Sequence, residues 1–111
     1  MASKISVKSK PIKPGDNGNY DLRLFVTGAL PNSARAIINI SSICEKYLKG
    51  NYKLEVIDIY QQPELALADD VIAVPMLIKK SPLPEARMAG DLSDTKTVLE
   101  NLLIDDSKIH G

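Results

Sequence analysis

The chain has 111 residues, which suits one domain of ordinary size and is too short for two. Of these residues 44% are hydrophobic, and 14 basic side chains balance 14 acidic ones. This composition predicts a folded core, while the zero net charge gives no overall field to attract nucleic acid or an anionic membrane. One cysteine and one histidine make neither an internal disulfide nor a four-ligand zinc site. We therefore expect no metal, no nucleic-acid partner and no membrane partner.

The two ends of the chain differ in composition from its middle. No apolar run reaches the roughly 18 residues of a membrane span, and the N-terminus has no signal-peptide core, so we expect a cytoplasmic protein. Residues 1–19 predict a flexible basic extension, broken by prolines and glycines and carrying Lys4, Lys8, Lys10 and Lys13. No aromatic residues for base stacking lie between these lysines, which disfavours a nucleic-acid tail. The expected domain covers residues 20–104, and 105–111 form a polar tail.

A strand, a helix and a second strand follow one another in the first half of the domain. Tyr20–Thr27 is short, rich in β-forming residues and increasingly apolar. A helix is predicted over 33–49, capped by Asn32 or Ser33, and its apolar stripe contains Ile37, Ile40, Cys44 and Tyr47, with Ala36, Ile43 and Leu48 beside them. Tyr52–Tyr60 is the second strand. Such a βαβ unit has parallel strands.

The second half has a less regular pattern. It predicts, in chain order, a short helix at Pro63–Asp70, a third strand at Val71–Ile78, a hairpin connection at 79–84, a fourth strand at Glu85–Ala89 and a last helix capped by Ser93 with Val98, Leu99, Leu102 and Leu103 on its apolar face. Pro75 has no N–H to donate, so it belongs at a strand start, an edge or a turn. The predicted order is βαβαββα, an α/β fold.

This order, with a proline opening the third strand, is similar to the thioredoxin fold. Within that fold the chain resembles the KaiB family over about residues 20–104. The resemblance is carried by the order and spacing of several stretches: Leu24–Gly28, Pro31–Ser33 with Arg35 and Ala36, Leu54–Ile59, Gln62–Ala66 and Gly90–Ser93.

The resemblance implies a function in protein–protein regulation. KaiB is a small, non-enzymatic member of the cyanobacterial circadian oscillator, which binds the ring-shaped ATPase KaiC and helps sequester KaiA. We therefore expect no enzyme activity and no cofactor, a KaiC-like partner, a KaiA-like partner where one is present, and a homo-oligomer. The resemblance implies a role in a circadian clock or in clock-derived stress adaptation. The family's second half has two arrangements, a thioredoxin-like form that binds KaiC and a tetrameric ground state, and the linear order of 63–104 favours the first.

Four residues are candidate partner contacts. Arg35, with Asn32 beside it, matches a basic position of the family, although an exposed helix charge is the alternative. Glu55 and Asp70 stand where family members tend to carry lysine. Reversed charge at a docking surface costs complementarity, so it reduces the expected affinity for a cyanobacterial-type KaiC or KaiA.

A candidate hinge lies where the family's two forms diverge. It consists of Ala89, Gly90 and Asp91, and the glycine tolerates positive φ. An ordinary strand-terminating turn is the alternative interpretation. The pair Asp69–Asp70 lies upstream of this hinge, and we expect both carboxylates to be solvated.

An enzyme of the thioredoxin or glutathione-transferase type is the competing hypothesis. It would use a cleft around Ser33 and Pro75. Dithiol enzymes of this fold place Cys-x-x-Cys between the first strand and helix, where residues 27–34 contain no cysteine. Cys44 lies on the apolar stripe and is expected to be inert, and His110 lies in the polar tail.

Overall fold

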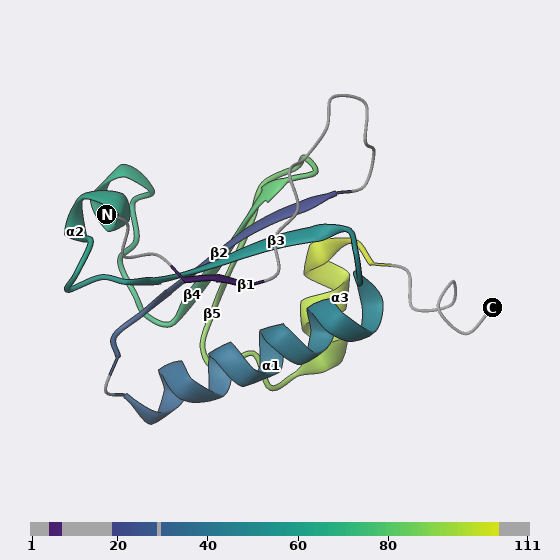
Figure 1. Ribbon diagram of the computed structural model, residues 1–111, viewed down its shortest axis with the longest axis horizontal. Coiled ribbons are helices and arrows are strands. Elements are labelled where there is room, and N and C mark those ends of the chain that lie inside the picture. Colours follow the sequence, from purple (N-terminus) through teal and green to yellow (C-terminus); the bar gives the residue numbers. More distant parts are fainter. Residues whose placement is uncertain (1–4, 8–18, 29, 105–111) are drawn as a thin grey trace.

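The computed structural model describes residues 5–7, 19–28 and 30–104 (Figure 1). Their elements are strands β1 (Ile5–Val7), β2 (Tyr20–Val26), β3 (Tyr52–Asp58), β4 (Met76–Ser81) and β5 (Ala86–Ala89), and helices α1 (Pro31–Tyr47), α2 (Pro63–Ala68) and α3 (Thr95–Leu102). The strands form one sheet in the order β1-β3-β2-β4-β5. From residue 20 onward, the predicted order βαβαββα and the thioredoxin-like arrangement are confirmed.

The βαβ unit β2-α1-β3 forms as predicted. β2 and β3 pair in parallel, from Tyr20 opposite Tyr52 to Val26 opposite Asp58. The predicted stripe of α1 packs on the sheet, where Ala36, Ile40, Ile43 and Cys44 are buried. Hydrophobic periodicity is sufficient to define this unit because each apolar face is covered by its nearest neighbours in the chain.

The predicted start and cap of α1 are wrong. The helix begins at Pro31, whose fixed φ suits the first helical position, and the N-cap residue Leu30 makes no side-chain capping bond. Ser33 instead lies inside the first turn, where its buried Oγ accepts a hydrogen bond from the N–H of Thr27 at 3.2 Å. The serine thus fastens the helix to the end of β2.

The third strand lies later in the chain than predicted. β4 starts at Met76, directly after Pro75, which is one of the places that a residue without an N–H can take. Residues 71–75 form the connection from α2, and the strand continues to Ser81, into the predicted hairpin connection. β4 runs antiparallel to β2 and pairs on its other side with β5. The segment between β3 and β4 passes the end of β2, because β2 lies between these two strands in the sheet.

The cap and the last residue of α3 also differ from prediction. Asp94, not Ser93, caps the helix, since its Oδ1 accepts from the N–H of Thr97 at 3.2 Å. Leu103 does not lie on the apolar face: it is exposed, has φ +63° and ends the helix. Val98, Leu99 and Leu102 are buried as predicted.

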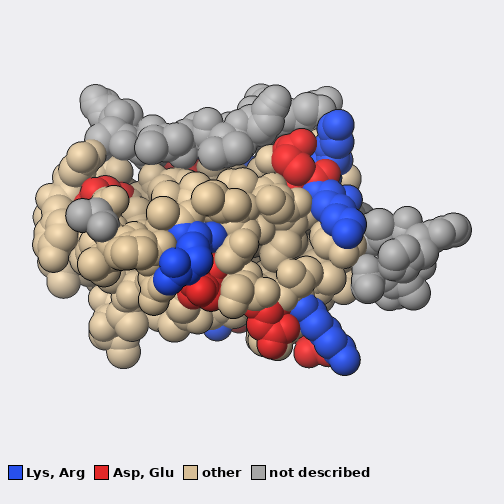
Figure 2. All heavy atoms as spheres, turned by 90° about the horizontal axis from the view of Figure 1, so that it is seen from below, with Lys and Arg blue, Asp and Glu red and all other residues tan. Residues whose placement is uncertain are grey.

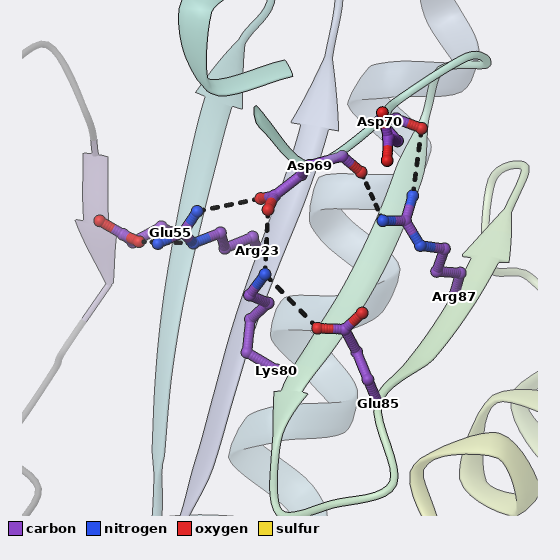
Figure 3. Close-up of polar contacts among 7 residues, drawn as sticks. All are labelled: Arg23, Glu55, Asp69, Asp70, Lys80, Glu85 and Arg87. Atoms are coloured by element: carbon purple, nitrogen blue, oxygen red, sulfur yellow. Dashed lines mark hydrogen bonds and ion pairs between the residues drawn. The ribbon is translucent and has the colours of Figure 1, made fainter. Parts of the chain in front are cut away.

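Side chains alternate between two cores on opposite faces of the sheet. On one face, α1 and α3 cover strand residues such as Leu24, Leu54 and Leu77. On the other face, α2 covers a smaller cluster that includes Phe25, Ile57 and Ile78. Polar side chains of β2, β3, β4 and β5 occupy the part of this second face beyond α2 (Figure 3).

The N-terminal extension contains one element that the sequence did not predict. Ile5–Val7 forms β1, which pairs antiparallel with β3. The predicted tail 105–111 lies outside the described residues, and the division of the chain at residues 20 and 105 stays a prediction.

Candidate functional site

Asn32, Arg35 and Asp91 form one surface group, here called the Arg35 cluster. The two α1 residues lie three positions apart, on one side of the helix, and the Arg35 guanidinium donates a hydrogen bond to Asn32 Oδ1. Arg35 Nε lies 3.4 Å from Asp91 Oδ2. The Arg35 side chain is 55% exposed, so it remains accessible to solvent despite these two contacts. The fold thus brings a predicted contact and a predicted hinge residue together.

Asp91 is the centre of the loop between β5 and α3. Its backbone carbonyl accepts from Asn39 Nδ2 at 2.8 Å, and its Oδ1 accepts from the N–H of Ser93 at 3.1 Å. The hydrogen bonding with Ser93 and, to a lesser degree, the pairing with Arg35 hold the pKa of Asp91 below its ordinary range. The carboxylate is therefore ionised at neutral pH and joins the loop to α1.

The other candidate hinge residues continue this loop. Ala89 ends β5, and Gly90 has φ +103°, a conformation that favours glycine. The Gly90 N–H donates to the carbonyl of Pro75 at 3.0 Å, so the loop is also bonded to the residue before β4. The loop borders a shallow groove of about 300 Å³ between β5 and α3, lined by Met88, Ala89, Gly90, Asp91, Thr97 and Val98, among others.

A second polar group lies on the face of the sheet that carries α2 (Figure 3). We call it the Asp69 network: Arg23, Glu55, Asp69, Lys80, Glu85 and Arg87. Asp69, only 8% exposed, ends α2, and each of its carboxylate oxygens accepts a hydrogen bond at 2.9 Å, one from Arg23 Nη1 and one from Lys80 Nζ. The expectation that Asp69 is solvated is therefore wrong.

The Asp69 network also includes hydrogen bonds to backbone carbonyls, and its cations lower the pKa of Asp69. Arg87 of β5 donates to the backbone carbonyls of Asp69 and Asp70, the two residues that directly follow α2. Burial raises the pKa of Asp69, but the hydrogen bonds from Lys80 and Arg23 outweigh it and leave this pKa below its ordinary value. The network thus ties α2 to strands β2, β4 and β5.

The predicted contacts Glu55 and Asp70 lie in or beside this network, not near Arg35. Glu55 is 3% exposed, and its Oε1 lies 3.5 Å from Arg23 Nε. It therefore offers no surface to a docking partner in this arrangement. Asp70 is exposed, with φ +54°. The four candidate contacts thus form two groups, one beside α1 and one on the opposite face of the sheet.

Thioredoxin-type enzymes carry their reactive cysteines in the turn between the first strand and the first helix of the fold. The corresponding residues 27–34 of this chain contain no cysteine. Ser33, the residue that the competing enzyme hypothesis used, is 1% exposed and already bonded to Thr27. Cys44 is fully buried, and burial, together with the Glu45 carboxylate, raises the pKa of its thiol to about 12. A thiolate is the reactive form, so burial and the raised pKa both disfavour reaction of this cysteine at neutral pH.

We expect Cys44 of the native protein to react with a disulfide reagent such as DTNB at least about a hundredfold more slowly than in the unfolded chain. The absorbance of the released thiolate measures both rates, with Cys44→Ser as the blank. In an insulin-reduction assay, the natural chain should show the same turnover as the Cys44→Ser variant. Fast labelling of the folded protein would contradict the inert assignment.

No group of three metal-ligating side chains is found within residues 5–7, 19–28 and 30–104. No helix in this part of the chain is long and apolar enough to cross a membrane.

The parallel β2-α1-β3 unit, the antiparallel pair β4-β5 and the proline before β4 define a thioredoxin-fold protein whose thiol turn has no cysteine. Solved structures agree: the N-terminal domain of Synechococcus elongatus SasA (TM-score 0.64, 22% identity, 88% of this chain and 97% of that one) and the Drosophila melanogaster thioredoxin Deadhead (TM-score 0.65, 17%, 79% and 84%). Residues 23–104 match the family model described as the KaiB domain. The chain belongs to the KaiB family.

Curated relatives are named as clock proteins. The circadian clock oscillator protein KaiB of Prochlorococcus marinus subsp. pastoris is 47% identical over 83 residues, which cover 75% of this chain and 78% of the relative. The KaiB protein of Synechococcus elongatus is 46% identical over 83 residues, which cover 75% of this chain and 81% of the relative. The resemblance to the KaiB family is thus confirmed, and β1 lies outside the matched residues.

Proposed function

We propose that this chain is a non-enzymatic regulator that binds a KaiC-like ATPase through the Arg35 cluster. The observation that carries the proposal is the joining of Arg35 and Asn32 on α1 to Asp91 of the β5–α3 loop at an exposed position. A guanidinium held in place by one partner loses less conformational entropy when it binds another. A KaiA-like protein, where the source has one, is a second partner in this proposal.

The surface around α1 supports docking by local complementarity. In the view from the side of α1, basic and acidic side chains of the described residues lie in small mixed groups between wide uncharged areas (Figure 2). Such a surface attracts a partner through matched contacts at short range, not through one broad field.

The direct test is complex formation with the KaiC-like ATPase of the source organism. Both purified proteins are mixed with ATP or with ADP, and the molar mass is followed by size-exclusion chromatography with light scattering. We expect a complex in at least one nucleotide state. Absence of a complex in both states would contradict the proposal.

We also propose that the chain self-associates into dimers or tetramers. Leu83, at the β4–β5 connection, is 79% exposed, which makes it a candidate for burial between copies. Met88, the other apolar residue of this hairpin considered from the sequence, is half-buried against the larger core.

We also propose that Ala89, Gly90 and Asp91 form the hinge between the two arrangements of the family's second half. Two matched glycine positions test this proposal. Gly50 and Gly90 have φ +83° and +103°, and no atom lies within 4 Å of a Cβ added at either position. Each alanine variant should therefore lose about 1–3 kcal/mol of stability by backbone strain alone. Only Gly90→Ala should also change the mass in light scattering and the affinity for the ATPase, because only it shifts the equilibrium between two arrangements. Equal behaviour of the two variants in both measurements would contradict the hinge.

A further inference from the structure

Strand β1 is the edge strand of the sheet beside β3. It pairs antiparallel with β3, with Ile5 opposite Val56, Ser6 opposite Glu55 and Val7 opposite Leu54. In the strand order β1-β3-β2-β4-β5, β3 would be an edge strand if β1 were removed (Figure 1). β1 precedes the residues 23–104 that the family model matches, so the match itself does not account for this cover.

Without β1, β3 would be an edge prone to pairing. It is seven residues long and buried on both faces, with Leu54 and Val56 in one core and Ile57 in the other. A long apolar edge with free N–H and C=O groups is a template for another strand, and native proteins usually cover it. β1 covers only the centre, residues 54–56, and leaves Tyr52, Lys53, Ile57 and Asp58 without a partner in β1.

We propose that β1 is a guard strand, which occupies in cis a strand-binding surface along β3. The ligand class for this surface is an extended segment of another polypeptide that adds to the sheet antiparallel to β3. Its preferred sequence follows from the register: apolar or β-branched residues opposite Val56 and Leu54, and a small residue opposite Glu55, as in β1 itself.

The short length of β1 makes the guard displaceable. Three paired residues bind weakly by themselves, and β1 stays in place because residues 8–19 tether it to β2. Such a tether gives an effective concentration in the millimolar range, which excludes weak strands. A partner strand that pairs with all of Tyr52–Asp58 makes more backbone hydrogen bonds than β1 and displaces it.

The test opens the guard in the full-length chain by proline substitution. Successive N–H groups of β1 point alternately toward and away from β3. Either Ser6→Pro or the double variant Ile5→Pro/Val7→Pro must therefore remove the N–H groups that face β3. Ser9→Pro, outside β1, is the matched control.

Hydrogen exchange of the β3 amides, followed by NMR, is the first measurement. In at least one of the two β1 variants, the amides that face β1 should exchange about tenfold faster or more, while the alternate amides, which face β2, keep their protection. The Ser9→Pro control should exchange like the natural chain. Unchanged exchange in both β1 variants would overturn the proposal.

Strand addition is measured next with a peptide of residues 1–12, labelled for fluorescence anisotropy. The opened variant should bind it about tenfold more tightly, or better, than the natural chain, whose own β1 competes. The same peptide with Ser6→Pro or with Ile5→Pro/Val7→Pro, whichever opened the guard, should not bind. Equal binding of the peptide to the opened variant and the natural chain would overturn the proposal. Neither readout requires the KaiC-like partner.

Discussion

Replacing Asp69 with asparagine is expected to lower the free energy of unfolding by about 2–3 kcal/mol at pH 7. The substitution keeps the size of the side chain but removes the negative charge that faces Arg23 and Lys80. Loss of one member of a buried ion pair costs up to about 3–5 kcal/mol. The expected loss is smaller here because Arg23 keeps Glu55 and Lys80 keeps Glu85 as partners. Urea unfolding measures it.

The neighbouring residue provides a matched control. Asp70→Asn makes the same chemical change at an exposed position, where asparagine tolerates the positive φ. We expect its stability to stay within about 0.5 kcal/mol of the natural chain. Equal stability of the two variants would show that the Asp69 network adds nothing to the fold.

The pH dependence gives a second test of the same carboxylate. The folded-state pKa of Asp69 lies below its ordinary value of 3.8, so the ionised group stabilises the fold above that pH. This contribution is lost as the pH falls through the lower, folded-state pKa. The stability difference between the natural chain and Asp69→Asn should therefore be constant near neutral pH and shrink below about pH 4. A difference that grows in acid would contradict the assigned direction.

Reversing the charge of Arg35 should weaken binding to the KaiC-like ATPase by about tenfold or more, if the proposed function holds. Arg35→Glu removes the exposed guanidinium and puts a carboxylate beside Asp91. The loss should appear mainly in the dissociation rate, as is usual for variants of one interface. Biolayer interferometry with the immobilised ATPase separates the two rates.

A charge swap distinguishes contact from positioning. In Arg35→Glu/Asp91→Arg the pair regains opposite charges, so a loop that needs only this pair would recover its position. A partner that contacts the guanidinium would still meet a carboxylate. We therefore expect the double variant to bind as weakly as Arg35→Glu, and recovery would assign Arg35 a positioning role. Lys46→Glu, on the last turn of the same helix, is the matched control and should bind like the natural chain.

The cap of α3 shows how far local chemistry can be predicted. Ser93 and Asp94 are both good capping residues, and no pattern in the sequence separates them. The choice depends on where the first turn places the N–H of Thr97, and this position follows from how α3 packs. The existence of the helix was predictable from Val98, Leu99 and Leu102, but its exact start was not.

The Asp69 network was not predictable from any local signal. Its cations come from β2, β4 and β5, and Arg23 stands 46 positions from Asp69 in the chain. The burial of Glu55 was equally hidden, because it depends on the parallel register that sets Arg23 opposite Glu55. A charged residue is expected at the surface unless a partner is known, and only the assembled sheet supplies the partner.

By itself, the sequence determined the β2-α1-β3 unit, the exclusion of Pro75 from the middle of a central paired strand and the absence of a dithiol turn. These features depend on hydrophobic periodicity and on the identity of single residues, which act over short distances along the chain. The tertiary structure alone decided that Arg35 meets Asp91, that Asp69 is a buried ion-pair centre and that Ile5–Val7 covers β3. The physical reason is that each of these contacts joins segments distant in sequence, and it forms only after the order and register of the strands are set.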